Sequence, residues 1–203
     1  IRYDLFLTEK GFVDASSRPY FRELVLNHTC GRLKVAPEHT EDRVLKYMGK
    51  PSFRLFDRLR VEFDKLTGEE GRKTGLVPYF ISSHPGCTMK DMERLASNPS
   101  LRGLYMDQVQ DFTPTPMTTS SVMFYSGLDP RDMKPVYVPR DPHEKAMQRA
   151  LMQYFIPANR PLVLEALRRA GRTDLIGHGP DCLVWDDHRR GNVGETAFPR
   201  KAS

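Results

Sequence analysis

The sequence contains few cysteines, and they lie far apart. Its 203 residues include three, Cys30, Cys87 and Cys182. No two of them have C-x-x-C or C-x-x-x-C spacing, so the chain offers no local zinc or iron–sulfur motif. A sparse, odd number of cysteines is typical of a reducing compartment. We therefore expect a cytoplasmic protein without a disulfide framework and with no metal held by this chain.

Long apolar runs and the common catalytic motifs are also missing. No apolar stretch approaches the roughly 20 residues that span a bilayer, so we expect no membrane partner. The sequence has no glycine-rich phosphate loop, no G-x-S-x-G elbow and no H-E-x-x-H helix. Charged residues make up 28% of the chain and hydrophobic residues 39%, which is ordinary for a globular protein. Any catalytic site must therefore be sought in less conventional patterns.

The charge balance is basic, but the basic residues are dispersed. The formal net charge is +5 and the pI is about 9.2. A nucleic-acid module usually concentrates its lysines and arginines on one face. A solvated surface is the simpler interpretation, and an RNA- or ribosome-associated binding module remains an alternative.

Short apolar runs alternate with helical patterns along the first part of the chain. A helical stripe of Leu55, Phe56, Leu59, Phe63 and Leu66 indicates core packing rather than a ligand site. Alternation of this kind predicts an α/β fold with a parallel sheet and outer helices. The predicted strands are residues 1–7, 33–37, 76–82 and 104–112.

Several helix boundaries can be predicted from capping residues. Thr40 is the expected N-cap of a helix that Gly49 ends, and Thr88 with Asp91 resembles a capping box. Asp141, followed by proline, is a further expected N-cap. A second C-terminal helix should begin near Asn159.

The composition changes near residue 127, which suggests three regions. We expect a sheet-containing unit over residues 1–126, then an extended connection and a small, mainly helical region over 127–185. Residues 186–203 are polar and read as a tail.

Polar residues gather where the predicted strands end. Because the carboxyl ends of parallel strands meet at one edge, these residues should share a ligand site. The site would suit a polar, zwitterionic ligand with a sugar and a base. The candidates at the three ends are Glu38 and His39, then Ser82, Ser83 and His84, then Gln110, Asp111 and Thr113.

Each candidate also has a simpler explanation. Glu38 and His39 could cap the next helix, His84 could be a turn residue, and Asp111 could pair with an arginine. Metal binding by the two histidines and a carboxylate is an alternative, but the spacing of these residues in the sequence is not diagnostic of a metal site. A TIM-barrel hydrolase or lyase using Glu38, His39 and His84 is another.

Four long motifs resemble the YgiQ family, a group of uncharacterised bacterial radical S-adenosylmethionine (SAM) proteins. More distantly, their arrangement is similar to radical SAM methylthiotransferases. The matching stretches are Leu33-Lys-Val-Ala-Pro-Glu-His-Thr40, Tyr47-Met-Gly-Lys-Pro51, Tyr79-Phe-Ile-Ser-Ser-His-Pro-Gly86 and Gln108-Val-Gln-Asp-Phe-Thr-Pro-Thr-Pro116. Residues 144–150 and 174–182 extend the resemblance into the C-terminal region.

The resemblance implies a partial TIM barrel, of which this chain would form about the last four parallel strands. Family members bind SAM and a [4Fe–4S] cluster, the latter through C-x-x-x-C-x-x-C, and catalyse radical reactions. That motif is absent here, so neither cofactor is expected to stay bound to this chain alone. The resemblance implies SAM contacts from Lys34, Ala36, Glu38, Ser82, Ser83, Gln110 and Thr113. His39, His84 and Asp111 would then face an unknown substrate.

The chain begins at Ile1 without an initiator Met and inside a predicted strand. We interpret this as a truncated start, so that the principal partner would be a missing N-terminal part of the same protein. We expect the fragment to be inactive alone. Its open sheet edge could mediate dimerisation.

Overall fold

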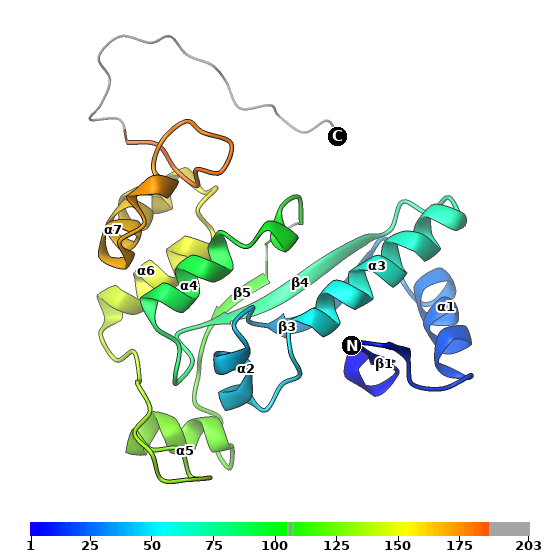
Figure 1. Cartoon of the computed structure of the whole chain (residues 1–203), viewed down its shortest axis with the longest axis horizontal. Helices are drawn as coiled ribbons and strands as arrows, with labels where there is room; N and C mark the ends of the chain where they lie inside the picture. Colours follow the sequence, from blue (N-terminus) through cyan, green and yellow to red (C-terminus); the bar gives the residue numbers. More distant parts are fainter. Residues whose placement is uncertain (105, 107, 187–203) are drawn as a thin grey trace.

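The fold is organised around a small parallel sheet. The computed structural model describes residues 1–104, 106 and 108–186. Strands β3 (Arg32–Glu38), β4 (Gly75–Ser82) and β5 (Gln108–Asp111) lie in the order β3-β4-β5, and both pairs are parallel (Figure 1). The predicted α/β class with a parallel sheet is therefore confirmed.

Seven α-helices accompany the sheet among the described residues. They are α1 (Ser17–Asn27), α2 (Asp42–Met48), α3 (Arg54–Glu69), α4 (Met89–Ala96), α5 (Thr119–Ser126), α6 (Pro142–Met152) and α7 (Arg160–Ala170). Short 3-10 turns cover Tyr3–Leu5, Pro99–Leu101, Pro157–Asn159 and Thr173–Leu175. The order of elements from β3 to β5 is βαα, βα, β, as predicted.

The predicted first strand, residues 1–7, is wrong. The segment forms a 3-10 turn and then β1 (Leu7–Thr8), which pairs antiparallel with β2 (Gly11–Phe12) and not with the main sheet. Tyr3, Phe6 and Leu7 are buried, whereas Leu5 is 69% exposed. Burial at spacings of three and four residues suits a helical turn, which overrides the apparent alternation of the sequence.

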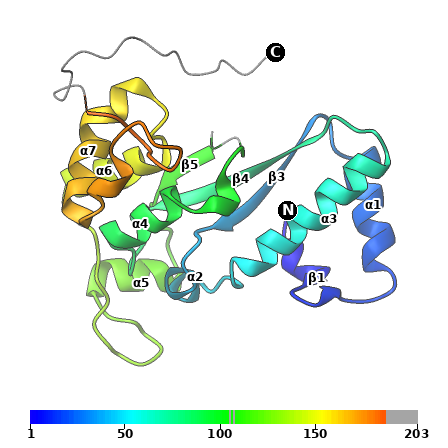
Figure 2. The ribbon, with the colours of Figure 1, turned by 45° about the horizontal axis from the view of Figure 1, so that its top comes forward.

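The two faces of the sheet have different surroundings. Leu33, Val35 and Phe80 join the hydrophobic core, together with Phe56 and Leu59 of α3. In Figures 1 and 2, α3 runs alongside β3 and β4, and α1 packs beside α3. The alternate positions carry Lys34, Ala36, Tyr79 and Gln110, which are exposed or half-buried. One face therefore packs on helices and the other is open.

The predicted stripe of α3 is confirmed as core. All five of its residues are buried, and Phe56 and Leu59 are fully buried. Burying a side chain of this size stabilises the fold by about 1.5–3 kcal/mol. The stripe therefore anchors α3 against the sheet and is not available to a ligand.

Of the three predicted capping features of α2 and α4, one is wrong and two are confirmed. The N-cap of α2 is Glu41 and not Thr40, because the chain stays extended one residue further. Gly49 ends α2 in the left-handed conformation, with φ of 65°. Thr88 and Asp91 form the predicted reciprocal capping box of α4.

In the C-terminal region the predicted helices are present, and one helix was not predicted. Asp141 caps α6 through the amides of His143 and Glu144. Helices α6 and α7 pack on each other and on α4. The sequence analysis gave no element for α5, which the structure places next to α2. Strand β5 begins at Gln108 and not at residue 104; residues 105 and 107, and the predicted tail apart from Asp186, lie outside the described residues.

Among the described residues, none of the helices combines the length and the apolar character that crossing a bilayer requires.

Gly86 allows the chain after β4 to pass close to α2. A Cβ atom at this position would lie 2.2 Å from Cδ2 of Tyr47, and the φ angle is +87°. The Gly86 amide also donates to the Tyr137 carbonyl at 2.6 Å. A side chain here would meet a ring and force an unfavourable backbone conformation.

We predict that Gly86→Ala lowers the free energy of unfolding by about 2 kcal/mol or more, through backbone strain and overpacking. Gly171→Ala is the matched control, because Gly171 has φ of +74° but no heavy atom within 4 Å of its added Cβ. The control should lose only about 1 kcal/mol. Urea unfolding of both variants measures the difference, and equal losses would contradict the close approach to Tyr47.

Candidate functional site

A cavity of about 460 Å³ opens where the parallel strands end. It lies at the carboxyl edge of the sheet, where α/β proteins place ligands. Its walls come from the ends of β3, β4 and β5, the end of α2 and the start of α5. The polar and aromatic residues that line it are Glu38, Tyr47, Lys50, Tyr79, His84, Gln110, Asp111, Phe112, Thr113, Thr115, Thr118, Thr119, Ser120 and Arg131.

Glu38 is the last residue of β3 and turns sharply into the cavity wall. Its φ angle is 69°, a left-handed conformation that is uncommon outside glycine, and the pairing of β3 with β4 shifts register here. Its Oε1 accepts an ion-pair contact from Lys50 Nζ at 3.0 Å. Its Oε2 is buried and has no partner among the described residues. A buried carboxylate oxygen without a donor is costly, so this atom is suited to accept a hydrogen bond from a ligand.

His84 follows β4 and also lines the cavity, with its ring fixed at both nitrogens. Its Nδ1 lies 2.7 Å from the Pro85 carbonyl oxygen, and its Nε2 lies 2.8 Å from Ser120 Oγ. Because a carbonyl only accepts, Nδ1 carries the proton and Nε2 accepts from the Ser120 hydroxyl. Burial lowers the pKa of His84 to about 4, so the ring is neutral at pH 7.

At β5, Gln110, Asp111 and Thr113 all line the cavity. Gln110 accepts a hydrogen bond from the Tyr79 hydroxyl across the open face of the sheet. Asp111 accepts from Ser82 Oγ at 2.6 Å and from Arg149 Nη1 at 3.2 Å. The simpler explanation of Asp111, a local pair with an arginine, is therefore confirmed. Thr113 is exposed at the rim.

Several predicted site residues do not line the cavity. Lys34 and Ala36 lie further back on the open face of the sheet. Ser82 is fully buried and bonded to Asp111. Ser83 has φ of 60°, and its amide donates to Gln148 Oε1 at 3.0 Å, beneath the strand ends. Ser83 therefore shapes the turn that presents His84.

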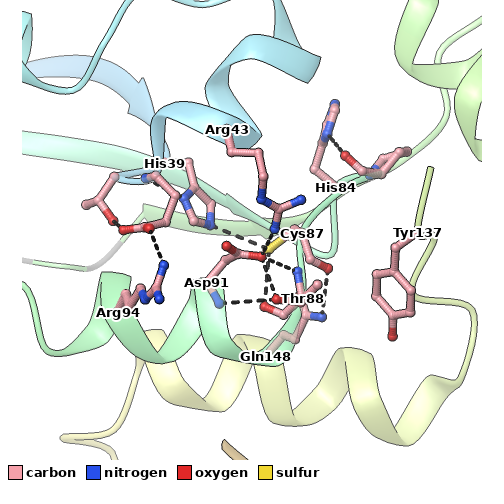
Figure 3. A network of polar contacts seen from close by, with 12 residues as sticks. His39, Arg43, His84, Cys87, Thr88, Asp91, Arg94, Tyr137 and Gln148 are labelled. Carbon is pink, nitrogen blue, oxygen red and sulfur yellow. Dashed lines mark hydrogen bonds and ion pairs between the residues drawn. The ribbon is translucent and has the colours of Figure 1, made fainter. Parts of the chain in front are cut away.

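His39 is fully buried and points away from the cavity. Its Nδ1 accepts from the Glu41 amide at 3.0 Å, so its Nε2 carries the proton and faces Cys87 Sγ at 3.5 Å (Figure 3). Burial lowers the pKa of His39 to about 3 and raises that of Cys87 well above its ordinary value. His39 is thus a neutral structural donor, and the predicted grouping of Glu38, His39 and His84 in one hydrolase site is wrong.

A second part of the network in Figure 3 joins α2 to α4. Asp91 accepts from the Thr88 amide at 2.7 Å and from the Thr88 hydroxyl at 2.6 Å, and it pairs with Arg43. Burial alone would raise its pKa, but these donors outweigh burial and lower it. Asp91 is therefore a charged structural anchor. Within the described residues, no three His, Cys, Asp or Glu side chains form a metal-binding group.

Lys50, Tyr47, Arg131 and Ser120 were missed by the sequence analysis. Lys50 follows the glycine that ends α2, where a ligand-facing position could have been suspected. Arg131 reaches Tyr47 through space, with 5.9 Å between its guanidinium carbon and the ring centroid. Contacts between segments so far apart in the sequence leave no local signal.

The two buried histidines, His39 and His84, should make the free energy of unfolding depend on pH. Both have folded pKa values, about 3 and about 4, below the ordinary 6.5. The unfolded chain therefore binds more protons between pH 6.5 and 4, so stability must fall as the pH falls. From pH 7 to pH 5 we expect a loss of about 4 kcal/mol, since each of the two groups contributes about 1.4 kcal/mol for every pH unit below 6.5.

Urea unfolding at pH 7, 6 and 5 measures this loss. His84→Gln should remove roughly half of the pH dependence, whereas the control His178→Gln, at an exposed position, should leave it unchanged. Equal stability at pH 7 and pH 5 in the unmodified protein would contradict neutral, buried histidines.

Comparison with known proteins extends the observations on the site. Residues 107–203 match the family model described as a domain of unknown function, DUF3362. A UPF0313 protein of Clostridium perfringens is 48% identical over 191 residues, which cover 94% of this chain and 28% of that protein. A UPF0313 protein of Methanosarcina acetivorans is 47% identical over 184 residues, covering 91% of this chain and 24% of that protein. No solved structure matches the chain significantly.

The chain spans only about a quarter of the length of these relatives. The names of these relatives state no activity. UPF0313 is the YgiQ family, so the relationship inferred from the motifs is confirmed at the level of close homologues, and across most of its length this chain is closely similar to UPF0313 proteins.

Proposed function

We propose that this chain supplies the SAM-binding and substrate-facing part of a radical SAM enzyme of the YgiQ type. The observation that carries the proposal is the unpartnered Oε2 of Glu38, buried in a polar cavity at the carboxyl edge of a parallel sheet. SAM has ribose hydroxyls and an amino group, which are the donors that such an oxygen lacks. The fold supports a ligand at this edge without naming it.

The open face of the sheet supports the barrel architecture. Lys34, Tyr79 and Gln110 alternate with core residues on three parallel strands, as inward-facing residues of a barrel do. The three strands would be the last ones of a partial TIM barrel, with further strands supplied by the remaining length found in the relatives. The open face would then line the interior, and the exposed sheet edges would pair with those strands or with a second copy.

The residues of this chain do not fit the cluster. Cys87 is buried beside His39, Cys30 is exposed and Cys182 lies in the C-terminal region, so the three thiols do not converge. We propose that the cluster ligands belong to the part of the enzyme outside this chain, and that this chain alone is inactive.

The cavity residues would act on SAM by binding and orienting it. Glu38 accepts from a hydroxyl or amino group, and Lys50 orients that carboxylate through its contact with Oε1. Gln110 and Thr113 offer neutral hydrogen-bonding groups from β5 and the loop after it. The Tyr79 ring and Ile81 provide an apolar wall, which suits a nucleobase face.

Glu38→Gln tests the proposal. The amide keeps the shape of the side chain but replaces one acceptor oxygen by a donor, so a ligand hydroxyl or amine loses its partner. Contrary to the expectation from the sequence, this chain should bind SAM measurably through the cavity even without the cluster. For Glu38→Gln we predict about tenfold weaker SAM binding in isothermal titration calorimetry, the loss expected for one buried hydrogen bond to a charged group. Thermal stability should change by no more than about 1 kcal/mol, because the amide oxygen can still accept from the half-exposed Lys50 in place of the ion pair.

Glu41→Gln is the matched control. Glu41 pairs with Arg94 at 3.3 Å and does not line the cavity, so its substitution should leave SAM affinity unchanged. Absence of SAM binding by the unmodified protein, or equal affinities for it and for Glu38→Gln, would refute the assignment of this cavity.

A further inference from the structure

Ser120 and His84 form a hydrogen-bonded pair that the proposed SAM contacts do not use. Ser120 lies in the first turn of α5 and His84 in the turn after β4, 36 residues earlier in the sequence. Ser120 is half-buried and His84 is 2% exposed, and both line the cavity. The pair therefore faces any molecule that binds there.

The three groups lie in the order that nucleophilic catalysis uses: Ser120 as the nucleophile, His84 as the base and the Pro85 carbonyl as the group that orients the base. The Ser120 hydroxyl donates to His84 Nε2 at 2.8 Å, and His84 Nδ1–H donates to the Pro85 carbonyl at 2.7 Å. The carbonyl fixes the tautomer in which Nε2 is free to take a proton. The Phe112 ring, with its centroid 4.9 Å from that of His84, holds the imidazole from the side.

Backbone donors lie beside the hydroxyl. Thr118 caps α5 through the Ser121 amide, at 3.2 Å. The amides of Thr119 and Ser120 precede it in the same turn and have no acceptor among the described residues. First-turn amides point out of a helix and stabilise negative charge, as an oxyanion requires.

We propose that Ser120 is a nucleophile activated by His84 and that the pair accepts acyl groups from small carboxylic esters. The Ser120 Oγ–carbonyl carbon bond forms while the hydroxyl proton moves to His84 Nε2. The carbon–oxygen bond to the alcohol then breaks, and the alcohol leaves with that proton. Water hydrolyses the acyl-serine in the reverse sequence, and His84 again carries the proton.

The surroundings of the pair set the substrate and the rate. Phe112 and Ile81 offer an apolar wall for a short acyl chain, and Thr115 and Thr119 offer hydroxyls near the amides. When His84 takes the proton, it becomes an imidazolium. Its Nδ1–H then donates to the Pro85 carbonyl and not to a carboxylate, so the imidazolium is weakly stabilised. We therefore expect slow turnover, and covalent labelling is the more sensitive measurement.

The experiment uses a fluorophosphonate probe on the 203-residue protein, with intact mass and peptide mapping. Ser120 Oγ would attack phosphorus, fluoride would leave, and the proton would pass to His84. We expect one label, located at Ser120 and absent from Ser120→Ala. His84→Gln should label at least about 100-fold more slowly, as expected when a general base is removed.

Ser126→Ala is the matched control on the same helix, since its hydroxyl donates to the Val122 carbonyl and has no histidine partner. It should label like the unmodified protein. Labelling of another residue, equal labelling of Ser120→Ala, or no labelling would overturn the proposal and leave the pair as a structural contact that holds α5. None of these results depends on SAM binding, so the two proposals fail separately.

The pH profile provides a second test if His84→Gln does not fold. With a His84 pKa of about 4, the labelling rate should be constant from pH 6 to 9. A rate that rises with a midpoint above pH 8 would contradict His84 as the base, since no imidazole of this site would gain or lose its proton there. The other charged or titratable groups around the ring and the cavity are His39, Glu38, Lys50, Asp111, Arg131, Tyr47 and Tyr79.

Discussion

The site depends on two left-handed turns at the ends of neighbouring strands. Glu38 and Ser83 both have positive φ angles although neither is glycine, and such conformations cost about 1–3 kcal/mol each. Buried contacts hold them: Gln148 of α6 binds the Ser83 amide, and the enclosed ring of His39 fixes the chain just after Glu38. Without these contacts the strands could continue straight, and neither Glu38 nor His84 would face the cavity.

The two histidines next to these turns have different roles, one structural and one facing the cavity, because their hydrogen-bond partners differ. His39 bonds to a backbone amide and a thiol under α4 and connects the turn to the core. His84 bonds to a backbone carbonyl and a serine hydroxyl at the cavity wall. Both are neutral at pH 7. The buried polar network is thus divided into a structural part behind the strand ends and a part that faces ligands.

Much of the architecture could be predicted from local patterns, and the cavity only in part. The spacing of Phe56 and Phe63, and the capping box at Thr88, identified helices without a structure. The prediction of a first strand over residues 1–7 failed because Tyr3 and Phe6 are buried at helical spacing within a short segment. Strand ends directed attention to Glu38 and His84, but Lys50, Arg131 and Ser120 join them only through the folding of distant segments. The extent of the cavity along the strands, which stops short of Lys34 and Ala36, likewise requires the fold.

A crystal structure of this chain with S-adenosylmethionine is the decisive experiment for a ligand site at Glu38. Its Glu38 carboxylate is the one cavity group whose buried oxygen lacks a partner among the described residues. We expect ligand density in the cavity between β3, β4 and α5, with a ligand hydroxyl or amine within hydrogen-bonding distance of Glu38 Oε2. Density at another surface, or an occupied cavity in which Glu38 Oε2 still has no donor, would contradict it.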